Sequence, residues 1–106
     1  MYYTYMLRCE DNSIYTGIAL DINKRMKEHF EKNNCAKYTY SHNAMRLEAV
    51  WESENKSLAS KLEYRIKILS KSQKENLIKD NNLMSKFLSS KLEIENYKRI
   101  EVSLNF

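Results

Sequence analysis

The sequence predicts a small α+β domain in which a three-stranded antiparallel sheet is flanked by helices. Two runs rich in β-branched and aromatic residues, 3–7 and 14–18, stand on either side of a short polar segment, and a third such run covers 46–51. Apolar residues recur at helical spacing over 22–32 and 56–69. Strands and amphipathic helices in this order form packed layers around one core.

The first two strands should form a hairpin. The segment 8–13 between them is rich in Asp, Asn and Ser, which turn a backbone through local hydrogen bonds. Because side chains alternate across a strand, Tyr5 and Leu7 should share a face, and the phenols of Tyr5 and Tyr15 can face the same side. Gly17 is the only glycine in the chain. At this place it predicts a bulge, or a close approach of the backbone to a ligand or a helix.

A helix should follow the hairpin. Asp21 is suited to cap a helix over 22–32. Arg25 and His29 are four residues apart along one edge of this helix, beside its apolar stripe, so both should lie near the sheet. The polar and aromatic segment 35–43 should form an ordered loop.

The third strand and the second long helix come next. Over 46–51, alternation predicts Leu47 and Ala49 on one face and Val50 on the other. The helix over 56–69 has the strongest apolar periodicity in the chain. Glu63 follows directly after a stripe residue of this helix, so its carboxylate should lie on the shoulder of the core rather than in open water.

The C-terminal quarter should add further helices and a strand. Ser72 and Glu75 match a capping box for a short helix, and 83–95 should form another. An alternation of apolar and polar residues then ends the chain and is typical of a strand, which should join the sheet edge or pair with another copy. Its apolar members are Ile100, Val102, Leu104 and Phe106.

The size and composition indicate one globular domain, in which we expect a main unit over 1–80 and an extension of helix and terminal strand over 81–106 packed on it. Hydrophobic residues make up 42% and charged residues 30%, which excludes a disordered chain. No apolar run reaches the length of a membrane span, and the N-terminus lacks signal-peptide features, so we expect a cytoplasmic protein. Cys9 and Cys35 should be reduced, buried thiols.

The motifs of the hairpin resemble those of a known family. Tyr3-Thr4-Tyr5, followed by Tyr15-Thr16-Gly17 ten residues later, resembles the paired signature of the GIY-YIG nuclease superfamily, and is most similar to its small stand-alone bacterial members. Tyr3 and Thr4 stand where the signature has glycine and isoleucine. The rest of the resemblance lies in Arg25, His29, Ala36 to Thr39, and Glu63.

The resemblance implies a metal-dependent endonuclease that hydrolyses DNA phosphodiester bonds. It implies Tyr15 near the attacking water, Tyr5 beside it, and Arg25 on the phosphate. It also implies Glu63 as the one protein ligand of a Mg²⁺ or Mn²⁺ ion, which is reasonable because Mg²⁺ commonly keeps several waters. His29 would accept a proton from Tyr15 or orient it.

The residues alone leave simpler alternatives open. The two tyrosines can be packing residues, Arg25 can pair with Glu28, and Glu63 can form a surface pair with Lys67. The corresponding alternative for the whole chain is a catalytically weak nucleic-acid-binding module of the same fold. A structural or partner-interaction protein is a third reading.

The net charge of +4 permits binding to a phosphate backbone. Lys37, Tyr38, Lys67, Lys71 and Lys74 are the candidate nucleic-acid contacts; a solvated basic face is their alternative. Without a second domain to read sequence, we expect a structure- or single-strand-selective enzyme with weak sequence preference. Its partner should be single-stranded or branched DNA rather than a specific duplex site, with RNA also open and no membrane. The chain should be a monomer, or a weak homodimer through the C-terminal strand.

Overall fold

The computed structural model describes residues 1–104 and has a four-stranded antiparallel sheet with the strand order β2-β1-β3-β4. The sequence predicted the α+β class correctly but counted three strands in the sheet; the fourth strand lies in the terminal segment that was expected to join the sheet edge or pair with another copy. The strands are β1 (Tyr2–Cys9), β2 (Ile14–Ala19), β3 (Ala44–Ser53) and β4 (Lys98–Ile100).

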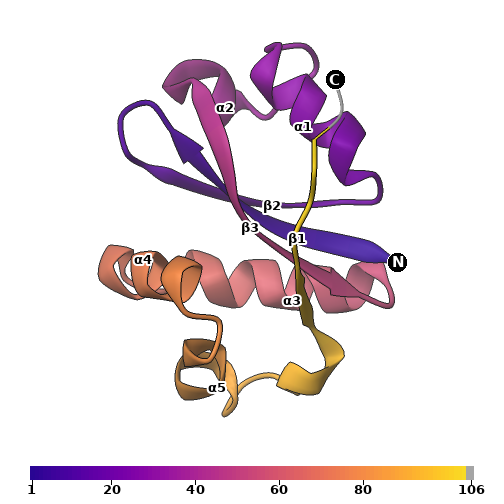
Figure 1. Ribbon diagram of the computed structural model, residues 1–106, viewed down its shortest axis with the longest axis vertical. Helices are drawn as coiled ribbons and strands as arrows, with labels where there is room; N and C mark the ends of the chain where they lie inside the picture. Colours follow the sequence, from indigo (N-terminus) through magenta and orange to yellow (C-terminus); the bar gives the residue numbers. More distant parts are fainter. Residues whose placement is uncertain (105–106) are drawn as a thin grey trace.

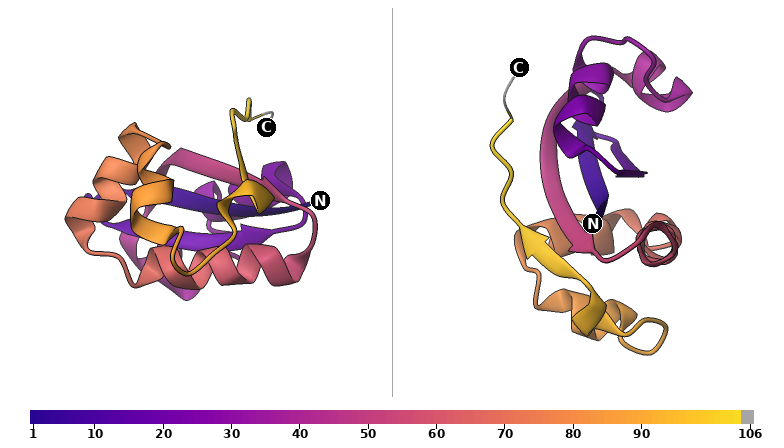
Figure 2. Two further views of the ribbon diagram at one scale, coloured as in Figure 1. Left: turned by 90° about the horizontal axis from the view of Figure 1, so that it is seen from below. Right: turned by 90° about the vertical axis from the view of Figure 1, so that its right-hand side faces the viewer.

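Helices cover both faces of the sheet (Figure 1). α1 and α2 lie on one side, while α3, α4 and α5 lie on the other, where Figure 2 shows α3 crossing beneath the strands. The helices are α1 (Ile22–Phe30), α2 (Lys37–His42), α3 (Lys56–Lys67), α4 (Lys71–Lys79), α5 (Leu83–Leu88) and the 3₁₀ helix η1 (Ile94–Asn96). Within residues 1–104, none of these helices has the length and apolar character needed to cross a bilayer.

Each face of the sheet has its own apolar core. On the α1 side, Met26 packs against strand residues that include Tyr5 and Leu7. On the α3 side, Leu62 packs with Met6 and with the α4 and α5 side chains. The predicted alternation along β1 is therefore confirmed. It follows that Tyr5 reaches the α1 side from the centre of the sheet.

A bulge changes the alternation along β3. Leu47 was expected to share a face with Ala49, but it packs in the core on the α1 side, whereas Ala49 packs on the α3 side. The register explains this difference, because Met6 is opposite Ala49 while the next residue, Leu7, is opposite Leu47. Glu48 is thus an extra residue, and one extra residue reverses the alternation.

The two long helices form close to where their sequence signals place them. The Asp21 side chain accepts a hydrogen bond from the backbone N–H of Lys24 and caps α1 as predicted. Asn55 caps α3 in the same way. Both helices end two residues before the predicted ends at 32 and 69. The buried stripe of α3 includes Leu62 and Ile66, as the periodicity indicated.

The predicted loop over 35–43 is instead the short helix α2. Tyrosine, threonine and histidine have low helix propensity, so local sequence does not favour this helix. Asn43 ends it in the left-handed region with a φ of 60°, and Asn34 precedes it at 59°. Thr39 is completely buried in this helix and contacts His29. Tertiary contacts therefore determine the helix.

The capping box of α4 was placed two residues too late. Ser70 accepts a hydrogen bond from the backbone N–H of Gln73, and the Gln73 side chain accepts one from the backbone N–H of Ser70. Ser72 and Glu75, the predicted pair, have the same spacing. Glu75 instead extends toward Arg8 on β1, a long-range contact that spacing alone does not show.

The end of the chain also differs from its prediction. The helix expected over 83–95 ends at Leu88, because the chain turns back to bury Tyr97, whose hydroxyl donates to the Leu58 carbonyl at 2.7 Å. The terminal strand is only Lys98–Ile100, paired with β3 at the sheet edge, and 101–104 continue without strand pairing. Phe106 lies outside the described residues. Cys9 is buried and Cys35 half-buried, and both are free thiols.

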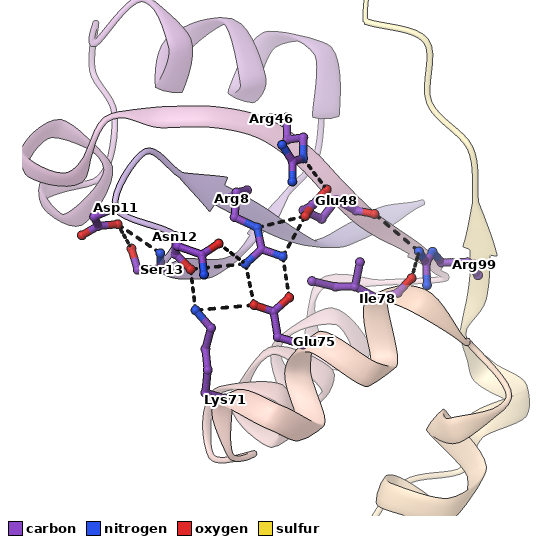
Figure 3. Close-up of polar contacts among 10 residues, drawn as sticks. All are labelled: Arg8, Asp11, Asn12, Ser13, Arg46, Glu48, Lys71, Glu75, Ile78 and Arg99. Atoms are coloured by element: carbon purple, nitrogen blue, oxygen red, sulfur yellow. Dashed lines mark hydrogen bonds and ion pairs between the residues drawn. The ribbon is translucent and has the colours of Figure 1, made fainter.

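A buried ion cluster joins the hairpin turn, β3 and α4 (Figure 3). Arg8 is only 5% exposed, and its guanidinium donates to both carboxylate oxygens of Glu75, at 2.6 and 2.5 Å. It also donates to Glu48 at 3.0 Å and to the Asn12 carbonyl at 3.2 Å. Bidentate pairs of this kind are strong, and losing one partner leaves a buried charge uncompensated.

This cluster should make the protein sensitive to acid. The hydrogen bonds from Arg8 lower the pKa of Glu75 to about 2. A depressed carboxyl pKa means that the stabilisation is complete above the ordinary value of 4.5 and is lost as pH falls toward 2. With allowance for solvent screening, the free energy of unfolding should fall by about 2 kcal/mol from this group.

The test is urea unfolding between pH 7 and pH 3. Glu75→Gln should be less stable than the parent at pH 7 and lose less stability on acidification. Exposed Glu95→Gln serves as the control and should follow the parent. A Glu75→Gln protein with the same pH profile as the parent would contradict the assignment.

Candidate active site

Three of the predicted site residues meet where β1, β2 and α1 come together. The Tyr5 hydroxyl lies 2.7 Å from Nε2 of His29, and both side chains are completely buried. The Tyr15 ring lies beside both, with centroid distances of 6.2 Å to Tyr5 and 5.5 Å to His29. His29, which was expected to serve Tyr15, is thus hydrogen-bonded to Tyr5.

Burial determines the protonation of this pair. Burial, followed by the neighbouring Tyr15, raises the pKa of Tyr5, although Arg25 opposes the shift. Burial, together with the positive charge of Arg25, lowers the pKa of His29 to about 4. At neutral pH the phenol is therefore protonated and the imidazole is neutral.

Arg25 lies at the edge of this group. Its guanidinium pairs with Glu28 at 3.0 Å and donates to the Asn34 carbonyl at 3.0 Å. Burial alone would lower the pKa of Arg25, but the hydrogen bonds with Glu28 and Tyr5 raise it. The helix pair with Glu28 that the sequence offered as an alternative is therefore present. The Arg25 side chain is 26% exposed, so part of it faces solvent.

Glu63 reaches the same group from α3. Its side chain is 23% exposed and pairs with Lys67 at 3.4 Å. The negative charge of Glu63 is the smallest of the causes that raise the pKa of Tyr5. The Lys67 ammonium lies 6.0 Å from the centroid of the Tyr15 ring. Glu63 is thus connected to the Tyr15 ring through Lys67, and the surface pair that the sequence offered as an alternative is formed.

α2 contributes residues that the sequence analysis did not assign to the catalytic group. The Tyr38 ring stacks on Tyr15 at a centroid distance of 5.8 Å and on His42 at 4.0 Å. Asp11 of the hairpin turn pairs with Nδ1 of His42 at 2.5 Å. Tyr38, predicted as a nucleic-acid contact, is thus stacked on two aromatic rings and is 38% exposed. The buried Thr39 lies 2.7 Å from Nδ1 of His29.

The lysines predicted to contact nucleic acid lie in separate parts of the structure. Lys67 belongs to the site just described. Lys71 contacts the Asn12 carbonyl and pairs with Glu75 at 3.5 Å, so it belongs to the ion cluster in Figure 3. Lys37 is exposed on α2, and Lys74 is half-buried on α4.

Gly17 explains how Tyr5 fits beneath Tyr15. A Cβ atom at this position would lie 2.5 Å from the Tyr5 hydroxyl oxygen, 2.7 Å from its Cζ and 3.0 Å from Cε2 of Tyr15. Such distances are far below van der Waals contact. The backbone of this glycine does approach another group closely, but that group is the Tyr5 side chain rather than the predicted ligand or helix, and the β1–β2 register shows no bulge here.

Gly17→Ala should cost about 1–3 kcal/mol of stability, as overpacking typically does, and should displace Tyr5 from His29. Thermal unfolding measures the cost. In a double-mutant cycle with Tyr5→Phe, which removes the nearest atom, the combined cost should be smaller than the sum of the single costs. Strict additivity would show that the alanine methyl is accommodated without touching Tyr5.

The donors available to a metal ion are few. Among residues 1–104, no three His, Cys, Asp or Glu side chains converge in a metal-binding group. Glu63 is a single carboxylate, held by one lysine at a distance longer than a good hydrogen bond. This donor set fits Mg²⁺, which can bind through one or two carboxylates and keep its waters.

A comparison with protein families shows which family this chain belongs to. A family model described as the GIY-YIG catalytic domain matches residues 1–76. The chain belongs to the GIY-YIG family. The resemblance seen in the hairpin is thereby confirmed, and all five candidate catalytic residues lie within the matched GIY-YIG region: Tyr5, Tyr15, Arg25, His29 and Glu63.

Among its relatives, the chain is similar to small UPF0213 proteins. One from Fusobacterium nucleatum is 43% identical over 105 residues, covering 99% of this chain and 98% of the relative. One from Vibrio cholerae is 44% identical over 84 residues, covering 73% and 76%. A solution NMR structure of a UPF0213 protein from Bacillus halodurans is 40% identical, with a TM-score of 0.49 and coverage of 74% and 84%.

GIY-YIG domains are nuclease domains, so a nucleic acid is the substrate class that membership implies. Members of the family are generally metal-dependent. The matched region ends at residue 76, within α4, one residue after the carboxylate that binds Arg8.

Proposed function

We propose that this GIY-YIG protein is a metal-dependent endonuclease that hydrolyses DNA phosphodiester bonds. One observation carries the proposal: side chains from β1, β2, α1 and α3 converge at one place, although they are far apart in the sequence. Phosphodiester hydrolysis needs a water to be deprotonated, a cation at the phosphate and a stabilised leaving group. The converging residues offer a group for each need.

Accessibility distinguishes the two tyrosines. Tyr15 is half-buried, so its phenol is the one that water can approach, and we assign it the position beside the attacking water. Tyr5 is completely buried, so it acts from behind, where it contacts Arg25. Arg25 would bind the phosphate, and His29 would hold Tyr5 in place.

Glu63 is the residue that would hold the metal ion, Mg²⁺ or Mn²⁺. When bound, such an ion stabilises negative charge on the phosphate and on the leaving oxygen. Lys67, which contacts both Glu63 and the Tyr15 ring, would then be free to meet the phosphate backbone.

The substrate is proposed to be single-stranded or branched DNA, bound chiefly through its phosphates. The net charge is +4, and none of the helices over residues 1–104 presents an evident base-reading surface. Exposed Tyr40, with the Lys32 ammonium 5.4 Å from its ring, is suited to stack on an unpaired base. We further propose that 1–80 carry the chemistry and that 81–106 brace the sheet edge.

The test is incubation with single-stranded, duplex, flap and junction DNA, each with Mg²⁺, Mn²⁺ or a chelator, and with matched RNA. The proposal requires cleavage that stops with the chelator, with little sequence preference and with binding that weakens as salt rises. Salt-dependent binding without cleavage under any condition would instead favour a binding module. The formed Glu63–Lys67 pair is the observation that keeps this second candidate open.

A further inference from the structure

We propose that Thr39 is a positioning residue of this site: its hydroxyl fixes which ring nitrogen of His29 carries the proton, and thereby orients the Tyr5 phenol toward Arg25. The position of the proton on His29 is inferred from the contacts of Thr39 and His29. Its effect on cleavage rests on the proposed nuclease function.

The argument begins with the single proton of a hydroxyl group. Thr39 Oγ1 donates to the Ala36 carbonyl at 3.0 Å. A carbonyl oxygen can only accept, so we assign the Thr39 proton to Ala36; the contact of 2.7 Å between Thr39 Oγ1 and Nδ1 of His29 is then donated by the imidazole. Thr39 and His29 are both completely buried, so no bulk water competes for either group. Nδ1 of His29 consequently carries a proton.

The second ring nitrogen then has the opposite role. A neutral imidazole carries one proton, so Nε2 presents a lone pair, and the Tyr5 hydroxyl at 2.7 Å donates to it. The neutral form is the one that burial favours, with a pKa of about 4 for His29. With its proton directed at His29, the Tyr5 oxygen keeps its lone pairs available to accept, and we assign Arg25, four residues before His29 on α1, as the cation that they meet.

The other tautomer would reverse this polarity. With a proton on Nε2, the imidazole would donate to the Tyr5 oxygen and occupy one of its lone pairs. The phenol proton of Tyr5 would then have to turn away from His29. If it pointed at the guanidinium of Arg25, two hydrogen-bond donors would face each other. Thr39 thus selects, from the neighbouring helix α2, the arrangement in which the Tyr5 oxygen is free to accept from the cation assigned to the phosphate.

Two variants isolate the hydroxyl. Thr39→Val keeps the shape of the side chain and removes the acceptor, whereas Thr39→Ser keeps the hydroxyl. The Ala36 carbonyl also accepts from the backbone N–H of Tyr40 at 3.0 Å, so it retains a partner in the valine variant. The group that loses its hydrogen-bond partner in the valine variant is therefore Nδ1 of His29.

Long-range ¹H–¹⁵N NMR spectra of the histidine rings report the tautomer directly. A His42→Gln variant assigns the signals, because the chain has only two histidines. The parent and Thr39→Ser should show His29 protonated at Nδ1, and Thr39→Val should shift the population toward Nε2. An Nε2-protonated His29 in the parent would overturn the proposal, and this measurement requires no variant at position 39 to fold.

Cleavage kinetics supply the second readout. Thr39→Val should lower kcat by about tenfold or more, with KM little changed, and Thr39→Ser should restore it. A valine variant that has the parent's tautomer and the parent's kcat would also overturn the proposal. If the tautomer shifts as expected but the parent cleaves none of the substrates, Thr39 positions His29 as proposed and the nuclease function is what fails.

Discussion

Glu63→Gln should abolish metal-dependent cleavage and leave DNA binding equal or tighter. The substitution preserves the shape and helix propensity of the side chain but removes the charge that would recruit a divalent ion. The one other partner of this carboxylate is a lysine at 3.4 Å, which is a weak compensation for a side chain that is mostly buried. Binding should not suffer, because a negative charge that repels phosphate has been removed.

Cleavage and binding assays of both proteins at matched concentration test this expectation. Glu54→Gln is the matched control, since Glu54 is exposed just before α3 and should cut like the parent. Lys67→Met separates the two interpretations further, because loss of the surface pair alone should not remove the requirement for a metal ion. A Glu63→Gln protein that cuts as fast as the parent would reduce Glu63 to a helix-surface residue.

Tyr15→Phe should lower kcat by about a hundredfold or more while the fold and DNA binding persist, as expected when a general base is removed. The reason lies in access. Tyr15 is half-buried at the site surface, whereas the Tyr5 hydroxyl is buried and already engaged with His29. Tyr5→Phe should therefore cost less, through misplacement of Arg25.

Single-turnover cleavage of the preferred DNA substrate measures both effects. Tyr64→Phe is the control, because Tyr64 is 58% exposed on α3 and should behave like the parent. Small and equal losses for the two site tyrosines would identify them as packing residues. A larger loss for Tyr5→Phe would exchange the roles assigned to the two phenols.

The parts of the fold that follow from local chemistry could be predicted from the sequence. The hairpin, the Asp21 cap and the stripe of α3 depend on residues close together in the chain, and each is present. The need for Gly17 also followed from its place at the end of a strand, although its neighbour Tyr5 did not.

What the sequence did not show depends on contacts across the fold. The bulge at Glu48 arises from pairing with β1, and α2 forms against the propensity of its own residues. The contacts of His29 are a further example. Local spacing placed His29 near the sheet, but only the packed structure shows that it meets Tyr5 and Thr39. The ion pairs of Arg8 likewise join segments that no sequence window contains.

The Arg8 cluster also sets a lower limit on the fragment of this chain that can fold. The guanidinium belongs to the first strand and its bidentate partner to the fourth helix, 67 residues later. A nascent or truncated chain that stops before Glu75 would have to bury the Arg8 charge without that partner, a penalty comparable to the whole stability of a small domain. Arg8 therefore gains its bidentate partner only when α4 forms, and folding in such a chain waits on its longest-range contacts.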